Sequence, residues 1–306
     1  IAQCLVGSEM CIRDRKYSEL AELFRSEKTD EEILDFLLNY HKNDIADMMA
    51  GMTEEERKRL YHLLGAQKVA EIFKYIEEPR KYIRELSVES AARVISEMDS
   101  DDAVDLLEDL DPEEKEQIVR MLDEDAKKDV KMLLSYDEEE IGSCMTTNYI
   151  CIPENLTIRQ AMSELVKQAG ENDNIMTIYV VDEKGVFAGA IDLKDLIRAR
   201  ENAHLEDLVL KSYPYVTDHE KIDDCMDRIL DYAEDSIPVL SEDKKILGVI
   251  TSEDLIEMVD NEMGEDYAKL AGLTAEEDLK EPTLQSMKKR LPWLIILLFL
   301  GMGVSS

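Results

Sequence analysis

Carboxylates at helical spacing are the side chains of this sequence that are best suited to chemistry. Acids that lie three or four residues apart share one face of a helix, where their like charges repel unless a cation lies between them. Mg²⁺ prefers such oxygen ligands and keeps several waters when one or two carboxylates bind it. The acids that we predict to bind a divalent metal on this ground are Asp101 and Asp105, and further along the chain Asp254, Glu257, Glu262, Glu265 and Asp266. A solvated acidic face is the alternative interpretation.

The composition agrees with a cation-binding role and argues against several others. The 306 residues include 36 Lys and Arg against 70 Asp and Glu, a formal net charge of −34. Nucleic-acid binding needs basic residues against phosphates, so we expect no nucleic-acid partner. The five Cys lack the paired spacing of disulfides or zinc sites. The four His form no H-E-x-x-H motif, and G-x-S-x-G and phosphate-loop motifs are absent, so we predict that the protein is not an enzyme.

Residues 16–138 have the pattern of short stacked helices. Apolar residues recur at helical spacing in several runs, and a residue that can cap a helix precedes the run in each case. The predicted caps are Thr53, Ser87, Ser100, Asp111 and Asp123. Helices of about ten residues are marginal alone. The sequence therefore predicts an all-α superhelical domain in which they stack.

Residues 139–258 contain an internal duplication. Three pairs of landmarks are separated by the same 59 positions: Val180 and Val239, Gly189 and Gly248, and Asp195 and Asp254. Each copy has two apolar strand-like runs before a helical pattern, and opens with a further strand that enters a helix. The predicted fold is therefore two β-α-β-β-α units, an α+β arrangement.

The two ends of the sequence differ from the rest. Residues 1–15 lack the helical pattern that follows and resemble translated adaptor sequence, so we treat them as a non-native leader. Near the other end, a basic cluster at 288–290 precedes Trp293 and an uncharged apolar run. This pattern is typical of the start of a transmembrane helix, which we place at 286–306, with residues 16–290 in the cytoplasm. A hydrophobic core helix is the alternative.

The ordered motifs resemble those of a known family. The strings GSCMTT at 142–147, YVVDEKG at 179–185 and GAIDLKD at 189–195 are similar to those of tandem CBS domains. With MDSDDAVDLL at 98–107 before them and WLIIL at 293–297 after them, the chain resembles the MgtE family of magnesium channels and transporters. The resemblance implies a helical domain at 16–138, CBS units at 139–200 and 201–258, and a long connecting helix at 252–285.

The resemblance also implies a mechanism. Members of the family are plasma-membrane proteins that form homodimers through their CBS domains. Their cytoplasmic part senses Mg²⁺ and gates a membrane pore, which would be formed by residues beyond 306. Acids of the helical domain and of the connecting helix share interdomain Mg²⁺, and by position these are Asp101, Asp105, Asp254, Glu257, Glu262, Glu265 and Asp266. A further ligand within the CBS dimer corresponds to Asp223, although other family acids fall on Lys221 and Ala233. We therefore expect Mg²⁺ to bridge acidic faces and favour a closed pore.

A second ligand follows from the CBS resemblance. Gly248, Thr251 and Asp254 fit the G-x-x-[ST]-x-x-D pattern with which CBS pairs bind adenine nucleotides such as ATP. The alternative is that Thr251 caps a helix and Asp254 lies in its first turn. Other interpretations of the whole chain are a soluble nucleotide-sensing CBS adaptor, an acidic scaffold for basic proteins, and a transporter of another divalent cation.

Overall fold

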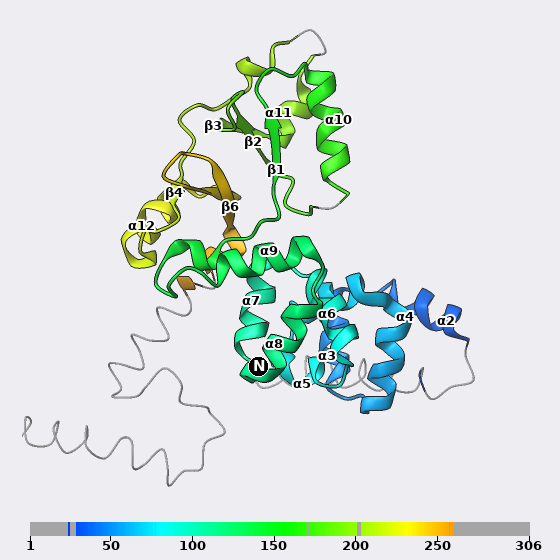
Figure 1. The fold of residues 1–306 in the computed structure, drawn as a ribbon. Coiled ribbons are helices and arrows are strands. Elements are labelled where there is room, and N and C mark those ends of the chain that lie inside the picture. The colour runs from blue at the N-terminus through cyan, green and yellow to red at the C-terminus, as the bar shows by residue number, and fades with distance from the viewer. Residues whose placement is uncertain are drawn as a thin grey trace, which may run out of the picture.

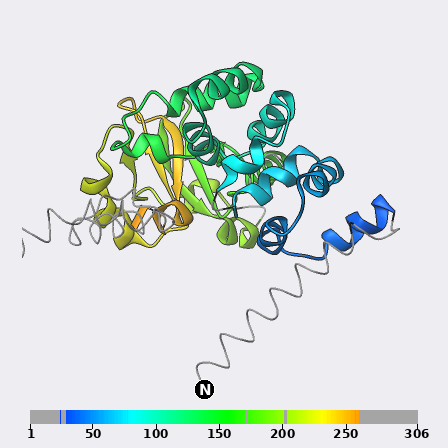
Figure 2. The same ribbon diagram turned by 90° about the horizontal axis from the view of Figure 1, so that it is seen from below.

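A computed structural model of the chain describes residue 24 and residues 29–76, 78–170, 172–200, 203–256 and 258–259. In these residues a helical domain precedes two three-stranded sheets that carry their own helices. Figure 1 shows the helical domain below the sheets, and Figure 2 shows the two parts side by side. The predicted all-α domain followed by an α+β pair is confirmed. Most of the predicted connecting helix, and the predicted transmembrane start at 286–306, lie outside the described residues.

The helical domain consists of short helices, as the capping pattern predicts. In the described part of the chain they are α2 (Asp30–Leu37), α3 (Lys42–Met49), α4 (Glu54–Phe73), α5 (Pro79–Ile83), α6 (Val88–Ser96), α7 (Ser100–Glu108), α8 (Pro112–Met121) and α9 (Glu124–Leu133). The longest, α4, is interrupted at Gly65, whose φ of 77° and ψ of 169° are not helical. Glycine adopts this backbone conformation without the steric cost of a Cβ.

Most of the predicted caps form. The backbone N–H of Thr53 donates to Glu56 Oε2 at 2.8 Å, and Glu56 N–H donates back to Thr53 Oγ1 at 3.3 Å, which makes a capping box at the start of α4. Asp111 caps α8 in the same way, and Ser87 and Asp123 accept backbone hydrogen bonds at the starts of α6 and α9.

Helix α7 is the exception, because its capping residues bind outside the helix. Asp99 is the N-cap without a side-chain cap bond, and Ser100 is the first helical residue, so the prediction of Ser100 as a cap is wrong. Ser100 Oγ instead accepts the Thr147 N–H at 2.9 Å, and Asp99 Oδ1 accepts from Asn148 Nδ2 at 2.7 Å. These bonds tie α7 to the segment that enters the first sheet.

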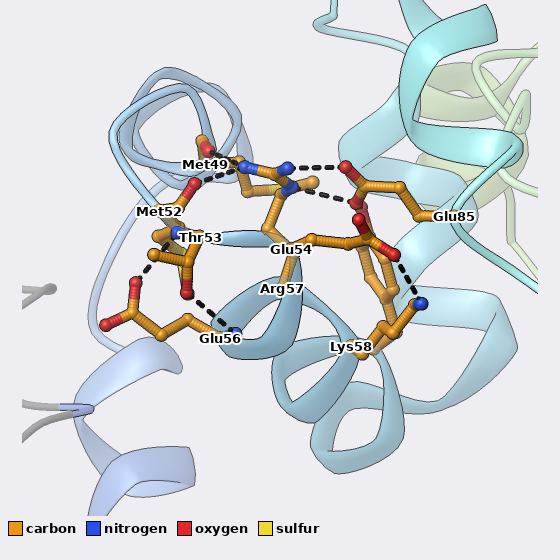
Figure 3. A network of polar contacts seen from close by, with 9 residues as sticks. Met49, Met52, Thr53, Glu54, Glu56, Arg57, Lys58 and Glu85 are labelled. Carbon is orange, nitrogen blue, oxygen red and sulfur yellow. Dashed lines mark hydrogen bonds and ion pairs between the residues drawn. The ribbon is translucent and has the colours of Figure 1, made fainter.

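A buried ion pair fixes α4 within the helical domain. Figure 3 shows the Arg57 guanidinium between the Glu85 carboxylate and the backbone carbonyls of Met49 and Met52. Arg57 Nε donates to Glu85 Oε2 at 2.8 Å, and the two side chains are only 8% and 10% exposed. Each charge is therefore matched inside the domain, and removal of one would leave the other buried and unpaired.

Two sheets of the same topology follow. The first contains β1 (Ile150–Pro153), β2 (Thr177–Val181) and β3 (Phe187–Asp192); the second contains β4 (Val216–Thr217), β5 (Ser236–Leu240) and β6 (Ile246–Thr251). In each, the first strand is parallel to the second and the second is antiparallel to the third. Val180 pairs with Gly189 and Val239 with Gly248, with a register shift directly after both. The predicted duplication is thus confirmed.

Short helices complete the two units. The first unit has η1 (Ile141–Cys144), α10 (Ile158–Gln168) and α11 (Leu193–Arg198), and the second has η2 (Leu205–Asp207) and α12 (Ile222–Tyr232). A further helical turn at 252–256 follows β6. It corresponds to α11 of the first unit, as the repeat requires.

The segment that enters each unit pairs with the sheet of the other unit. Thr146 and Val249 exchange two backbone hydrogen bonds of 2.9 Å, and Leu210 forms the equivalent bridge to Ala190. Gly248 lies beneath the first crossing, where a Cβ would come within 2.7 Å of the Thr146 carbonyl oxygen. The two units therefore form one interlocked pair.

The core of the helical domain continues into the second unit. A single cluster of buried apolar side chains extends from Ile33 and Leu107, through Met145, to Ile237 and Leu255. The first unit has its own cluster, which includes Ile152 and Ile178. This shared core holds α7 against the helical turn that follows β6.

Candidate metal site between the helical domain and the second unit

Acidic residues of α7 face the turn that follows β6. Asp101 and Asp102 lie in the first turn of α7, and Asp254 lies in the turn at 252–256. All three side chains are half-buried. Carboxylates so placed lose part of their hydration while their like charges repel.

The pKa values show both effects. Burial raises the pKa of Asp101 well above its ordinary value, and the charge of Asp254 raises it further. Burial also raises the pKa of Asp254, and raises that of Asp102 to about 7. The repulsion between Asp101 and Asp254 means that the helical domain and the second unit bring like charges within interacting range.

One oxygen of Asp101 has no partner. Its Oδ1 is shielded from solvent and accepts no hydrogen bond from the described residues. A buried acceptor without a donor costs free energy, which a cation at this position would offset. The donor set suits Mg²⁺, which one or two carboxylates bind together with waters. Among the described residues, no three His, Cys, Asp or Glu side chains converge on one metal position.

The remaining predicted ligands are placed as follows. Asp105 is exposed one turn after Asp101, and its charge adds to the effect of burial in raising the pKa values of Asp102 and Cys144. Asp223 is exposed in the first turn of α12, and no hydrogen bond or ion pair among the described residues joins it to α7. The other predicted ligands lie outside the described side chains: Glu257, Glu262, Glu265 and Asp266.

Sequence reasoning missed three residues of this interface. Asp102 belongs to the acidic motif of α7, and its neighbour Asp101 was the signal that could have found it. Lys74 and Glu253 form an ion pair of 3.1 Å across the interface. Because these two residues are far apart in the chain, spacing alone gives no signal that they meet.

The predicted nucleotide-binding residues have structural roles here. Thr251 N–H donates to Asp254 Oδ2 at 2.7 Å, and Asp254 N–H donates to Thr251 Oγ1 at 3.3 Å, which is the helix-capping alternative. Gly248 lies beneath Thr146 rather than facing open space. Nucleotide binding by these residues stays a prediction.

Comparison with known proteins agrees with the two-part architecture. Residues 40–139 match the family model of the MgtE intracellular N domain, and residues 139–202 and 205–261 match that of the CBS domain. The crystal structure of the soluble part of a magnesium transporter aligns with a TM-score of 0.77 and 30% identity, covering 82% of this chain and 99% of that one. This chain belongs to the MgtE family.

Further MgtE proteins extend the likeness. The magnesium transporter MgtE of Enterococcus faecalis is 38% identical over 304 residues, which are 98% of this chain and 66% of that protein. This chain therefore spans about two thirds of that relative's length. The cytosolic domain of the Mg²⁺ channel MgtE in complex with ATP aligns with a TM-score of 0.70 at 26% identity, covering 79% of this chain and 99% of that one. Within the described residues, no helix has the length and apolar character needed to cross a membrane.

Proposed function

We propose that this chain is the Mg²⁺-sensing regulatory part of a magnesium transporter or channel, not an enzyme. The carrying observation is the pair of half-buried, mutually repelling carboxylates, Asp101 and Asp254, with Asp101 Oδ1 unpartnered between the helical domain and the second CBS unit. The MgtE relatives support Mg²⁺ as the ion. In this proposal the pore lies in the plasma membrane and residues 16–290 lie on its cytoplasmic side.

The proposed mechanism follows from the charges. Without Mg²⁺, ionised carboxylates of α7 and of the turn after β6 repel and weaken the contact between the two parts. With Mg²⁺ bound, the charges are neutralised and the parts close. A ligand shifts such an equilibrium only by its differential affinity for the two states, and a site built from both parts exists only in the closed one. The closed arrangement holds the chain that follows Asp254 and favours a closed pore.

Limited proteolysis of the chain with proteinase K tests this proposal. Mg²⁺ is expected to slow cleavage relative to EDTA, and Asp101→Asn is expected to remove most of that protection. Asp125→Asn is the matched control, because Asp125 is an exposed acid in the first turn of the neighbouring helix α9. Equal cleavage rates of the unsubstituted chain in Mg²⁺ and EDTA would refute Mg²⁺ sensing. Protection by Mn²⁺ or Co²⁺ but not by Mg²⁺ would favour a transporter of another ion.

We also infer a homodimer through the CBS units. Exposed apolar side chains recur at equivalent places: Val166 and Leu230 are each the ninth residue of α10 and α12, and Ile197 and Ile256 follow β3 and β6. They are 68%, 44%, 63% and 65% exposed. A second copy placed on a twofold axis would cover such exposed apolar side chains. Sedimentation velocity of Val166→Glu should show a monomer; a dimer of unchanged stability would contradict the inference.

Adenine-nucleotide binding is a second proposed function, because the cytosolic domain of one relative is known in complex with ATP. Gly248, Thr251 and Asp254 are the residues proposed to contact it. Asp254 also belongs to the acidic interface, so Mg²⁺ and a nucleotide would compete for it. Calorimetry with ATP in EDTA should show binding that Thr251→Val weakens. Absence of binding to the unsubstituted chain would exclude this function.

A further inference from the structure

Lys74 is a basic side chain placed between acidic surfaces of two domains. It is the C-cap residue of α4 in the helical domain. Its Nζ lies 3.1 Å from a carboxylate oxygen of Glu253, in the turn after β6, and 3.8 Å from one of Asp99, the N-cap of α7. The ammonium group therefore contacts both sides of the interface between the helical domain and the second CBS unit.

The surroundings of Lys74 are acidic from three directions. A cavity of about 190 Å³ beside it is lined by Asp102 of α7, Asp173 of the first CBS unit and Glu253 of the second. Lys42 also borders this cavity, but it forms a 2.9 Å ion pair with Glu71 inside the helical domain. Among the described residues that line the cavity, Lys74 is the base with an ion pair across the interface.

Lys74 stays charged in this position and acts on the acidic cluster. Burial opposes its charge, but Asp102, Glu253 and Asp99 outweigh burial and raise the pKa of Lys74. Burial raises the pKa of both Asp102 and Asp254, and the positive charge of Lys74 works against that rise. Its ammonium is thus a counter-charge for the same carboxylates that face each other across the interface.

We propose that Lys74 is a built-in cation that holds the helical domain against the second CBS unit when Mg²⁺ is absent. Its charge and its reach across the interface do part of what a bridging metal would do. Unlike a metal ion, it is covalently attached, so its contribution does not vary with the Mg²⁺ concentration. A role of Lys74 in regulation rests on the proposed Mg²⁺ response. Lys74 would set how firmly the helical domain and the second CBS unit are already held together in the metal-free protein.

The test compares proteinase K cleavage of the 306-residue chain in EDTA. Lys74→Met should be cleaved about fivefold faster, the effect of about 1 kcal/mol expected of a partly exposed ion pair. Lys42→Met is the matched control and should be cleaved at the unsubstituted rate, because its ion pair lies within one domain. Far-UV circular dichroism verifies that each variant keeps its helix content. Unchanged cleavage of Lys74→Met in EDTA would overturn the proposal.

A double-mutant cycle separates the contact from general loosening of the fold. Glu253→Gln removes the same ion pair from the other domain and should also accelerate cleavage. The variant with both substitutions should be cleaved no faster than the faster single variant, because both act on one contact. Purely additive effects would overturn the proposal. Added Mg²⁺ tests the proposed function separately. If Mg²⁺ protects neither the unsubstituted chain nor the variants while the differences in EDTA persist, Mg²⁺ sensing fails and the Lys74 contact stands.

Discussion

Replacement of Asp102 by Asn is expected to stabilise the metal-free protein against unfolding. Burial raises the pKa of the Asp102 carboxyl to about 7 from an ordinary 3.8. A carboxyl whose pKa is raised in the folded state favours folding fully only below its unfolded value, and that contribution is lost progressively as the pH rises from 3.8 to about 7. Asparagine has nearly the same size and keeps a carbonyl acceptor, but it removes the charge.

The magnitude follows from the two pKa values. At pH 8 the carboxyl is ionised in both the folded and the unfolded state. The difference between a pKa of 3.8 and one of about 7 then corresponds to about 4 kcal/mol against folding. At pH 5.5 the folded protein holds the proton while the unfolded chain releases it, which reduces this cost to about 2 kcal/mol. The Asn variant carries neither cost, so its advantage should be about twice as large at pH 8 as at pH 5.5.

Urea unfolding in EDTA, followed by far-UV circular dichroism at both pH values, measures this advantage. Asp125→Asn is the control, since removing an exposed acid from the first turn of α9 should change stability by less than about 1 kcal/mol at either pH. A gain for Asp102→Asn of the same size at pH 8 and pH 5.5 would refute the reasoning from charge. A loss of stability at both pH values would show that the folded protein stabilises the Asp102 carboxylate.

Three further substitutions test other parts of the structure. Arg57→Met should lower the free energy of unfolding by about 3–5 kcal/mol because it strands the buried Glu85 carboxylate; added Glu85→Gln should recover part of the loss, and an unchanged urea midpoint would contradict this. Gly248→Ala should lower the melting temperature far more than Gly170→Ala. The added Cβ would lie 2.7 Å from a backbone oxygen at position 248, but 3.5 Å from one at position 170. Equal effects would argue against the close approach of Thr146 to Gly248. Asp101→Asn should abolish the rise in melting temperature that Mg²⁺ produces, and a full rise in this variant would exclude Asp101 as a ligand.

Local signals along the chain specify the helices, the strands and their repetition. Capping boxes such as Thr53 with Glu56 are local, since donor and acceptor lie three residues apart, and they form where they were predicted. The two sheets reproduce the predicted duplication, and in the structure Gly189 and Gly248 pair with the equivalent valines Val180 and Val239. The acidic spacing of α7 likewise marked Asp101, because helical periodicity decides which side chains share a face.

Which of these groups meet depends on how the two domains pack against each other. The same residue types that cap other helices, here Asp99 and Ser100, bind Asn148 and Thr147 instead, because the segment entering the first sheet lies against the start of α7. Burial of Asp101 beside Asp254, and the reach of Lys74 to Glu253, depend on contacts between residues more than 100 positions apart. Spacing along a chain carries no information about such pairs, since their encounter is set by the packing of a core shared between two domains.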